Sequence, residues 1–426
     1  MSRIFLSYSS DAAVQAGALR DWLNANGWND VVPKAEPPEG AGAGDSGRGA
    51  LGEYATRCDA VLFLVSRNWL ASQDCRDEYD LARKLDKAVF IAPTESLSPE
   101  ELHVLHPRSD RVFPLHAEET ANLDHEGKSI TFSVEGLEKL KAGLAQVAVD
   151  ARFFDWPPPG DPGRAPYRGF DAFETADAGV FFGREEPLIE ALDALRGLVE
   201  APKPRLFVVL GPPGSGISSF LRAGLWPRLE RDSRYFYPLP VVRPGAAAIS
   251  GADGLVPALA RATEKVGAES SAAKIREALA SGSDALRSLF KDIAGRAAIG
   301  PKPPTLVVGI DRAEELFRAE GAGESDRLLK TLGELAAVDA PAVLVVFALR
   351  SVSYDDLARA SPLEGMERKI FPLEAMPIDG FRAAVERPAQ RVVQAGGALE
   401  IDPDLTQALL DDVEASGGDA LPLFSF

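Results

Sequence analysis

The sequence predicts an α/β protein of two domains: a doubly wound parallel sheet, then a second α/β domain that ends in a small helical region. Three observations carry this prediction. Apolar runs of strand length alternate with helical patterns over the first 150 or so residues, a pattern typical of parallel sheets covered on both faces. A second series of such runs, broken by a glycine-rich turn at 211–219, follows a proline-rich stretch. The length of 426 residues also exceeds that of one ordinary domain.

The composition describes an acidic globular chain. It is 46% hydrophobic and 26% charged, and its net charge is -18. Because binding to nucleic acid depends on Lys and Arg, no nucleic-acid partner is expected. Cys58 and Cys75 are too few for a disulfide framework, which favours a reducing compartment. No apolar run approaches the roughly 20 residues of a membrane span, so a cytoplasmic protein without a membrane partner is predicted.

The first domain is expected to place its ligand at the carboxyl ends of its strands. Ser7, Ser9 and Ser10 follow the first strand there, and a segment that begins at Ser66 follows the third. The predicted strands are Arg3–Ser7, Trp28–Val32, Ala60–Ser66, Ala88–Ala92 and Arg111–Leu115. The predicted helices are Ala12–Asn26, Ala50–Cys58, Gln73–Asp86 and Val134–Val147.

Glu78 is the acid of interest in this domain. Four apolar residues at helical spacing share its face: Cys75, Leu81, Ala82 and Leu85. A carboxylate in register with an apolar stripe is costly unless it is paired or used. The sequence leaves two interpretations, a functional acid or a first-turn acid favoured by the helix dipole and by Arg76 or Arg83.

Two stretches of the first domain resemble a TIR domain. Residues 4–11, Ile-Phe-Leu-Ser-Tyr-Ser-Ser-Asp, resemble its opening. The pattern S-x-N-aromatic-x-x-S-x-x-C-x-x-E resembles its signature and is met by Ser66, Asn68, Trp69, Ser72, Cys75 and Glu78. Asp74 departs from the Trp that many members carry before the Cys. The resemblance covers residues 1–152 and implies a flavodoxin-like fold.

The TIR resemblance implies that Glu78 cleaves the bond between nicotinamide and ribose in NAD, the substrate, with a linear or a cyclic product. The residues implied around NAD are Ser7, Ser9, Ser10, Trp69, Ser72 and Cys75. A carboxylate stabilises the oxocarbenium-like charge of such a reaction. Trp69 either stacks on the ligand or packs in the core. Self-association through TIR domains is also implied, with the Gly- and Pro-rich loop at 33–49 as a lid or as a solvated excursion.

The proline-rich stretch at 153–166 separates the domains. It contains Trp156-Pro157-Pro158-Pro159-Gly160, which suits neither a helix nor a central strand. We expect a semi-rigid spacer there.

Gly211–Ser219 predicts a phosphate-binding loop. It follows the apolar run Leu206–Leu210 and opens a helix, so backbone N–H groups and the helix N-terminus face a phosphate. The spacing fits G-x-x-x-x-G-K-[ST], but Ile217 stands at the lysine position. Loss of that charged contact costs about 1.5–3 kcal/mol or more, so weak or absent ATPase activity is expected. Two alternatives stay open. Ile217 is an engineered change from lysine, or Lys203 or Arg222 supplies the missing positive charge.

Four motifs in order resemble the STAND class of signalling NTPases, which is AAA+/NACHT-like. They are Phe-Gly-Arg-Glu at 182–185, the loop, Asp311 with Glu314 and Glu315 after the run 304–310, and Arg350 after the run 343–349. The resemblance implies a P-loop NTPase-like domain at 167–375 and a helical lid at 376–426. Further helices are expected at 255–266, 272–280, 285–296, 381–395 and 403–415. The apolar end at 421–426 predicts a truncated lid or a missing partner surface.

The STAND resemblance also assigns roles for ATP or ADP. Gly183 and Arg184 lie near the base, and Arg350 senses the terminal phosphate. The phosphates contact Gly211, Gly214, Gly216, Ile217, Ser218 and Ser219. Mg²⁺ lies at Ser218 and Asp311. Glu314 or Glu315 positions water, unless the pair is a solvated helix start.

Together these patterns predict a TIR effector that cleaves NAD when assembled, under the control of a STAND-like module and a sensor or partner protein, in bacterial defence or signalling. The alternative is a TIR adaptor that only recruits partners. A third interpretation, a protein that is chiefly an ATPase, is disfavoured by Ile217.

Overall fold

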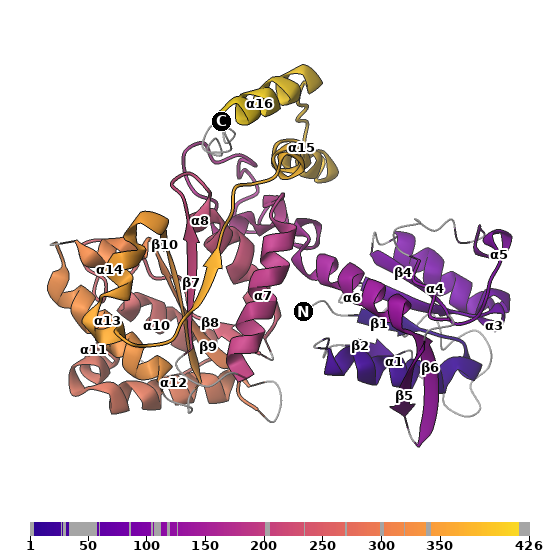
Figure 1. Cartoon of the computed structure of the whole chain (residues 1–426), viewed down its shortest axis with the longest axis horizontal. Helices are drawn as coiled ribbons and strands as arrows, with labels where there is room; N and C mark the ends of the chain where they lie inside the picture. Colours follow the sequence, from indigo (N-terminus) through magenta and orange to yellow (C-terminus); the bar gives the residue numbers. More distant parts are fainter. Residues whose placement is uncertain are drawn as a thin grey trace. The chain divides into compact units, whose positions relative to one another are not determined.

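The computed structural model describes most of the chain in two compact units, Met1–Val149 and Asp150–Phe426 (Figure 1). The described residues are 4–26, 28, 31–33, 58, 60–84, 87–103, 105, 112–116, 120–125, 127–200, 205–233, 235–268, 271–298, 302–318, 320–337 and 342–416. The predicted helix at 50–58, the loop at 33–49 and the apolar end at 421–426 fall almost wholly outside these residues.

The first unit contains the predicted parallel sheet. Its strand order is β2-β1-β3-β4, and the strands are β1 (Ile4–Ser7), β2 (Val31–Pro33), β3 (Ala60–Val65) and β4 (Ala88–Pro93). The strand expected at Arg111–Leu115 is reduced to a bridge between Val112 and Ile91. Backbone N–H groups of Phe113 and Leu115 extend this pairing along β4.

Helices cover both faces of this sheet. On one face Phe63 of β3 packs with Trp69 and Tyr79, and on the other Phe90 stacks on Phe113. The helical elements are η1 (Ser10–Ala12), α1 (Ala13–Ala25), α3 (Arg67–Ala71), α4 (Gln73–Lys84), α5 (Pro99–His103) and α6 (Val134–Val149). The doubly wound fold class is therefore confirmed.

An antiparallel hairpin in this unit was not expected from the sequence. It joins β5 (Thr120–His125) to β6 (Lys128–Ser133) and packs on α1, where His125 Nδ1 lies 2.6 Å from Asp21 Oδ2. Its first strand alternates exposed and half-buried residues and carries few large apolar side chains, so it lacks the signal of a buried strand.

The second unit is built on a five-stranded parallel sheet with the order β11-β7-β10-β9-β8. The strands are β7 (Leu206–Gly211), β8 (Phe236–Pro238), β9 (Thr305–Asp311), β10 (Val343–Arg350) and β11 (Lys369–Pro372). β7, β9 and β10 match the three apolar runs of the sequence. Because β10 lies between β7 and β9, the phosphate loop, Arg350 and Asp311 end up side by side at one edge of the sheet.

Helices pack on this sheet and extend past it (Figure 1). The main apolar core joins the sheet to α10, α11, α12 and α13. A separate small cluster of Met376, Phe381, Leu410 and Val413 joins α15 to α16, in the region expected to form the helical lid. The helices are α7 (Glu185–Glu200), α8 (Ile217–Ser219), α9 (Trp226–Arg231), α10 (Leu255–Lys265), α11 (Ala272–Ser281), α12 (Ser283–Ala297), α13 (Ala322–Ala336), α14 (Tyr354–Ala358), α15 (Ile378–Gln394) and α16 (Pro403–Ser416). Shorter helical segments are η3 (Ala151–Phe153), η4 (Thr175–Val180), η5 (Phe220–Leu225), η6 (Ala313–Phe317), η7 (Ser351–Ser353) and η8 (Ser361–Leu363).

The proline-rich stretch packs onto the second unit, although the sequence suggested a spacer. The guanidinium groups of Arg228 and Arg231 lie 4.7 Å and 3.7 Å from the ring centre of Phe154. Arg391 of α15 donates to the carbonyl of Phe154 at 2.8 Å. Trp156 is 8% exposed. Residues 153–156 are thus held by both α9 and the lid helix, and the compact unit begins at Asp150.

Candidate functional sites

Glu78 lies buried at the carboxyl end of the first unit's central strands. It is 2% exposed, on the face of α4 that its spacing indicated. Ser7, the last residue of β1, donates its hydroxyl hydrogen to Glu78 Oε2 at 2.6 Å. The strand order reverses between β1 and β3, which is where doubly wound sheets bind ligands.

Trp69 and Cys75 form the wall behind this carboxylate. Trp69 is 0% exposed and meets Phe63 edge to face at 5.5 Å, so it packs in the core and offers no surface to stack on a ligand. Its indole N–H donates to Ser7 Oγ at 3.3 Å. Cys75 is 1% exposed in the same cluster. In this structure both side chains lie in the core and Trp69 contacts Ser7, and the NAD contacts expected of the two residues stay a prediction.

The other serines of the motif organise the loops around the acid. Ser66 caps α3 by accepting from the Trp69 N–H at 3.1 Å, and its hydroxyl lies 3.3 Å from that of Ser9. Ser72 accepts from the Cys75 N–H at 3.4 Å and so serves the start of α4. Ser10 is exposed in η1.

A second polar contact joins the same two loops. Asn68 donates to Asp11 Oδ2 at 2.7 Å. Hydrogen bonds from Ser9 and Asn68 hold the pKa of Asp11 below its usual value. The loops that follow β1 and β3 are therefore tied together beside Glu78.

The second unit contains a cavity of about 260 Å³ above the sheet edge. Most of the predicted nucleotide residues line it: Arg184, Gly214, Gly216, Ile217, Ser218, Ser219, Asp311, Glu314 and Arg350. Aromatic side chains of Phe170, Phe173, Phe181 and Phe182 line it too. The cavity therefore combines a glycine-rich loop with an aromatic wall, as a nucleotide requires.

The glycines of the loop are needed for its shape. Gly214 and Gly216 have φ values of 85° and 81°, a left-handed conformation that favours glycine. A Cβ on Gly211 would lie 2.5 Å from Ser215 Oγ. The chain then enters the helix formed by α8, η5 and α9 with its first N–H groups toward the cavity.

Gly183 and Arg184 hold the entry segment in place. A Cβ on Gly183 would lie 2.2 Å from the carbonyl oxygen of Gly380, so glycine permits close contact with α15. Arg184 is 2% exposed and donates to the carbonyls of Glu374 at 2.7 Å and Ser215 at 3.0 Å. Burial lowers its pKa to about 10. Arg184 therefore joins the phosphate loop to the segment after β11.

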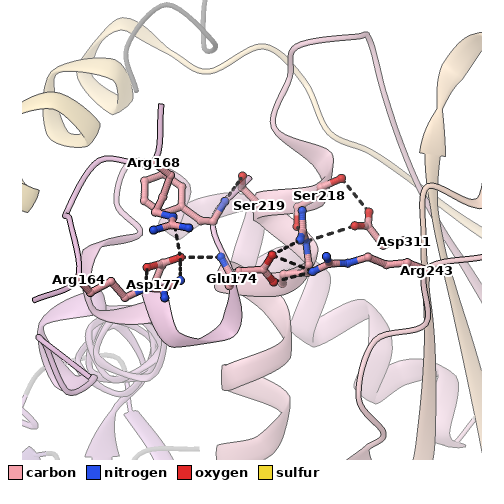
Figure 2. Close-up of polar contacts among 10 residues, drawn as sticks. Arg164, Arg168, Glu174, Asp177, Ser218, Ser219, Arg243 and Asp311 are labelled. Atoms are coloured by element: carbon pink, nitrogen blue, oxygen red, sulfur yellow. Dashed lines mark hydrogen bonds and ion pairs between the residues drawn. The ribbon is translucent and has the colours of Figure 1, made fainter. Parts of the chain in front are cut away.

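Ser218 and Asp311 meet at the position expected for a metal. Ser218 Oγ donates to Asp311 Oδ1 at 2.8 Å, and Asp311 is 1% exposed (Figure 2). Two oxygen donors at a phosphate loop suit Mg²⁺, which uses few protein ligands and keeps several waters. Asp311 Oδ2 forms an ion pair with Arg222 Nε at 3.2 Å, so one oxygen is held by a cation.

Arg222, which is 4% exposed, belongs to a partly buried ion-pair network that the sequence did not predict. It contacts Glu174 Oε1 at 2.5 Å, and Arg243 contacts Glu174 Oε2 at 2.7 Å. Arg222 does not belong to the described cavity lining, and its guanidinium contacts the carboxylates of Glu174 and Asp311. Lys203 lies outside the described residues.

Glu174 belongs to a segment, residues 164–177, that we call the strap. Phe173 N–H donates to Ser219 Oγ at 3.0 Å, which ties the strap to the phosphate loop (Figure 2). Arg164 and Asp177 close the strap through an ion pair of 2.5 Å. The one local signal was the spacing of Glu174 and Asp177, which form a capping box at η4.

The two acids after Asp311 separate in the structure. Glu314 lines the cavity, and its Oε1 lies 3.5 Å from Arg350 Nε. Glu315 Oε2 instead accepts from the N–H of Gly245 at 3.1 Å. Of the pair, Glu314 is the one placed to face a phosphate or a water.

The fold and the cavity define a P-loop nucleotide-binding unit joined to a TIR unit. Family models agree with both assignments: "TIR domain" matches residues 4–121, and "Novel STAND NTPase 1" matches residues 166–426. The second match spans more than half of the chain, which therefore belongs to the Novel STAND NTPase 1 family. A TIR domain joined to a STAND NTPase is a signalling or defence module.

Several solved structures resemble parts of the chain at low sequence identity. The Orc1 protein of Aeropyrum pernix in complex with DNA is 15% identical, with a TM-score of 0.35 over 57% of this chain and 59% of that one. PCH-2 of C. elegans is 12% identical, with a TM-score of 0.32 over 57% and 63%. NtrX of Brucella abortus in complex with ATP is 14% identical, with a TM-score of 0.28 over 96% and 78%. The chain thus spans less than two thirds of the Orc1 and PCH-2 chains.

No curated protein matches the sequence. Within the described part of the chain, none of the helices combines the length and apolar character needed to cross a bilayer.

Proposed function

We propose that the chain is a TIR effector that cleaves the nicotinamide–ribose bond of NAD on assembly, under the control of its nucleotide-binding unit, in bacterial defence or signalling. One observation carries the proposal. Glu78 is 2% exposed at the switch point of the sheet, and the Ser7 hydroxyl orients it at 2.6 Å. Burial of a carboxylate costs free energy, so a buried acid at the edge of the sheet where ligands bind favours a functional role.

The chemistry suits a single carboxylate. When the glycosidic bond breaks, its electron pair leaves with nicotinamide as a neutral base, and positive charge develops on the ribose. The Glu78 carboxylate stabilises that charge in a dry environment. Water then adds to the ribose carbon and releases a proton, or an internal nucleophile closes a cyclic product. Ser7, held by Trp69, fixes the carboxylate during this step.

The second unit supplies control in this proposal. ATP or ADP would occupy the cavity, and Ser218 and Asp311 would hold Mg²⁺, which would neutralise phosphate charge when bound. Because Ile217 carries no charge, turnover is slow and the bound nucleotide acts as a clamp. The strap links the phosphate loop at Ser219 to the chain that leads from the TIR unit.

The test is nicotinamide release from NAD by the full chain at high concentration with a crowding agent. Glu78→Gln is compared with Glu135→Gln, because Glu135 is an exposed acid whose side chain is 76% exposed on α6. We expect release by the wild type and by Glu135→Gln, and a loss of at least about 100-fold in Glu78→Gln. Self-association of the wild type without any release would favour the adaptor.

A further inference from the structure

Ile217 leaves the phosphate loop without its usual cation, so the cavity must obtain positive charge elsewhere if it binds a nucleotide. Three arginines line the described cavity: Arg184, Arg312 and Arg350. They differ in how many contacts their side chains already form with other residues.

Arg184 and Arg350 already form polar contacts within the protein. Arg184 donates to two backbone carbonyls and is 2% exposed. Arg350 lies 3.5 Å from a carboxylate oxygen of Glu314. Each therefore has much of its donor capacity or charge offset before any phosphate arrives.

Arg312 is different in three respects. Its side chain lines the cavity from an exposed position directly after Asp311. Its guanidinium forms no hydrogen bond or ion pair with another residue in the described portion of the chain, whereas its backbone carbonyl accepts from the N–H of Glu315 at 2.9 Å. Its backbone has φ 53° and ψ 48°, and it is the one non-glycine residue with positive φ among those described.

A left-handed arginine is disfavoured, and such residues cluster where the backbone places a side chain for function. The conformation also turns the chain sharply between β9 and η6. It sets Arg312 next to Asp311, whose Oδ1 lies 2.8 Å from Ser218 Oγ of the loop. Arg312 therefore lines the same cavity as Ser218 and Asp311, one residue from the position expected for the metal.

We propose that Arg312 supplies the phosphate-binding charge that Ile217 lacks, so that a nucleoside di- or triphosphate is held from the end of β9 as well as from the loop. A guanidinium contacts two phosphate oxygens at once, which a single ammonium group does not do in the same fixed geometry. This inference rests on the proposed nucleotide-binding function of the cavity.

The test is a rescue experiment on the full chain with Mg²⁺ and either ADP or a non-hydrolysable ATP analogue, by isothermal titration calorimetry. The variants are Arg312→Asn, Ile217→Lys, and the two combined. Asn tolerates the left-handed backbone and removes the charge. Arg359→Asn is the control, since the Arg359 side chain is 81% exposed and lies outside the cavity. Circular dichroism confirms that each variant is folded.

We expect Arg312→Asn to weaken binding by about 10- to 100-fold, Arg359→Asn to leave it unchanged, and Ile217→Lys to restore it in the double variant. Binding by Arg312→Asn within twofold of the wild type would overturn the inference. So would a loss that Ile217→Lys fails to restore, or binding that appears only after Ile217→Lys. No binding by any variant would overturn the nucleotide function of the cavity as well.

Discussion

Glu78 and Asp311 are both buried carboxylates at the carboxyl edge of a parallel sheet, but their partners differ. Glu78 is 2% exposed and accepts a hydrogen bond from the Ser7 hydroxyl. Asp311 is 1% exposed, accepts from the Ser218 hydroxyl and forms an ion pair with Arg222. These different partners predict different roles for the two carboxylates.

The ion pair makes Asp311 part of a structural network. Its negative charge offsets a buried guanidinium that also contacts Glu174, so removal of one partner leaves another charge exposed to a low-dielectric interior. The Ser7 hydroxyl, which carries no charge of its own, orients the Glu78 carboxylate. Mutations should therefore separate stability from activity between the two sites.

The largest effect on stability is expected for Asp311→Ala. It leaves Arg222 without one of its two carboxylates in a buried site, which costs about 3–5 kcal/mol of unfolding free energy. Urea denaturation measures this loss. Glu78→Gln, which keeps the shape and a hydrogen-bond acceptor, should change stability by less than about 1 kcal/mol. Equal losses in the two variants would break the comparison.

Trp69→Phe tests whether the hydrogen bond from Trp69 to Ser7 is as important for activity as the packing of the Trp69 ring. A smaller aromatic ring replaces the indole in the core, and the N–H that orients Ser7 is lost. We expect nicotinamide release to fall while KM changes little. The reason is that Trp69 holds Ser7, which holds the Glu78 carboxylate, and the variant removes one hydrogen bond worth about 1 kcal/mol from this series. Tyr79→Phe, in the same aromatic cluster, is the control for packing. A rise in KM alone would instead indicate a role in binding NAD.

Glu174→Gln tests the tie between the strap and the phosphate loop. The variant keeps an acceptor but loses the charge that Arg222 and Arg243 share. Because the Glu174 side chain is 38% exposed, the loss is expected at about 1–2 kcal/mol, below that of Asp311→Ala. Hydrogen exchange should rise along the strap in this variant. Unchanged exchange there would show that the strap is held by other contacts.

Glu324 provides a carboxylate outside both sites, and its expected effect on stability is smaller than those of Asp311→Ala and Glu174→Gln. Burial raises its pKa, but hydrogen bonds from Ser250 and Ile249 outweigh this and bring the pKa below its ordinary 4.5. A lowered folded pKa means that the stabilising contribution is present above the ordinary pKa and is lost as pH falls through the folded one. Glu324→Gln should cost about 1 kcal/mol at pH 7 by thermal denaturation, and this cost should shrink as pH falls below the ordinary pKa and through the lower folded one. A cost that stays constant with pH would contradict this sign.

The sequence predicted what depends on local periodicity. The strands that support both sites, the burial of Glu78 and the glycine positions of the phosphate loop all follow from spacing along the chain. The network around Arg222 could not be predicted from spacing, because its partners Glu174 and Asp311 lie 48 and 89 positions away and leave no local pattern. The left-handed backbone of Arg312 has no signal in its residue type, since arginine rarely adopts it.

The central claim is that the chemistry lies at Glu78 and the control at the cavity, in separate units. It is tested most directly by measuring nicotinamide release and nucleotide affinity on the same Glu78→Gln protein. The account predicts that release from NAD is lost while the Kd for Mg²⁺-nucleotide stays within twofold of the wild type. Nicotinamide release that survives in Glu78→Gln would contradict the account.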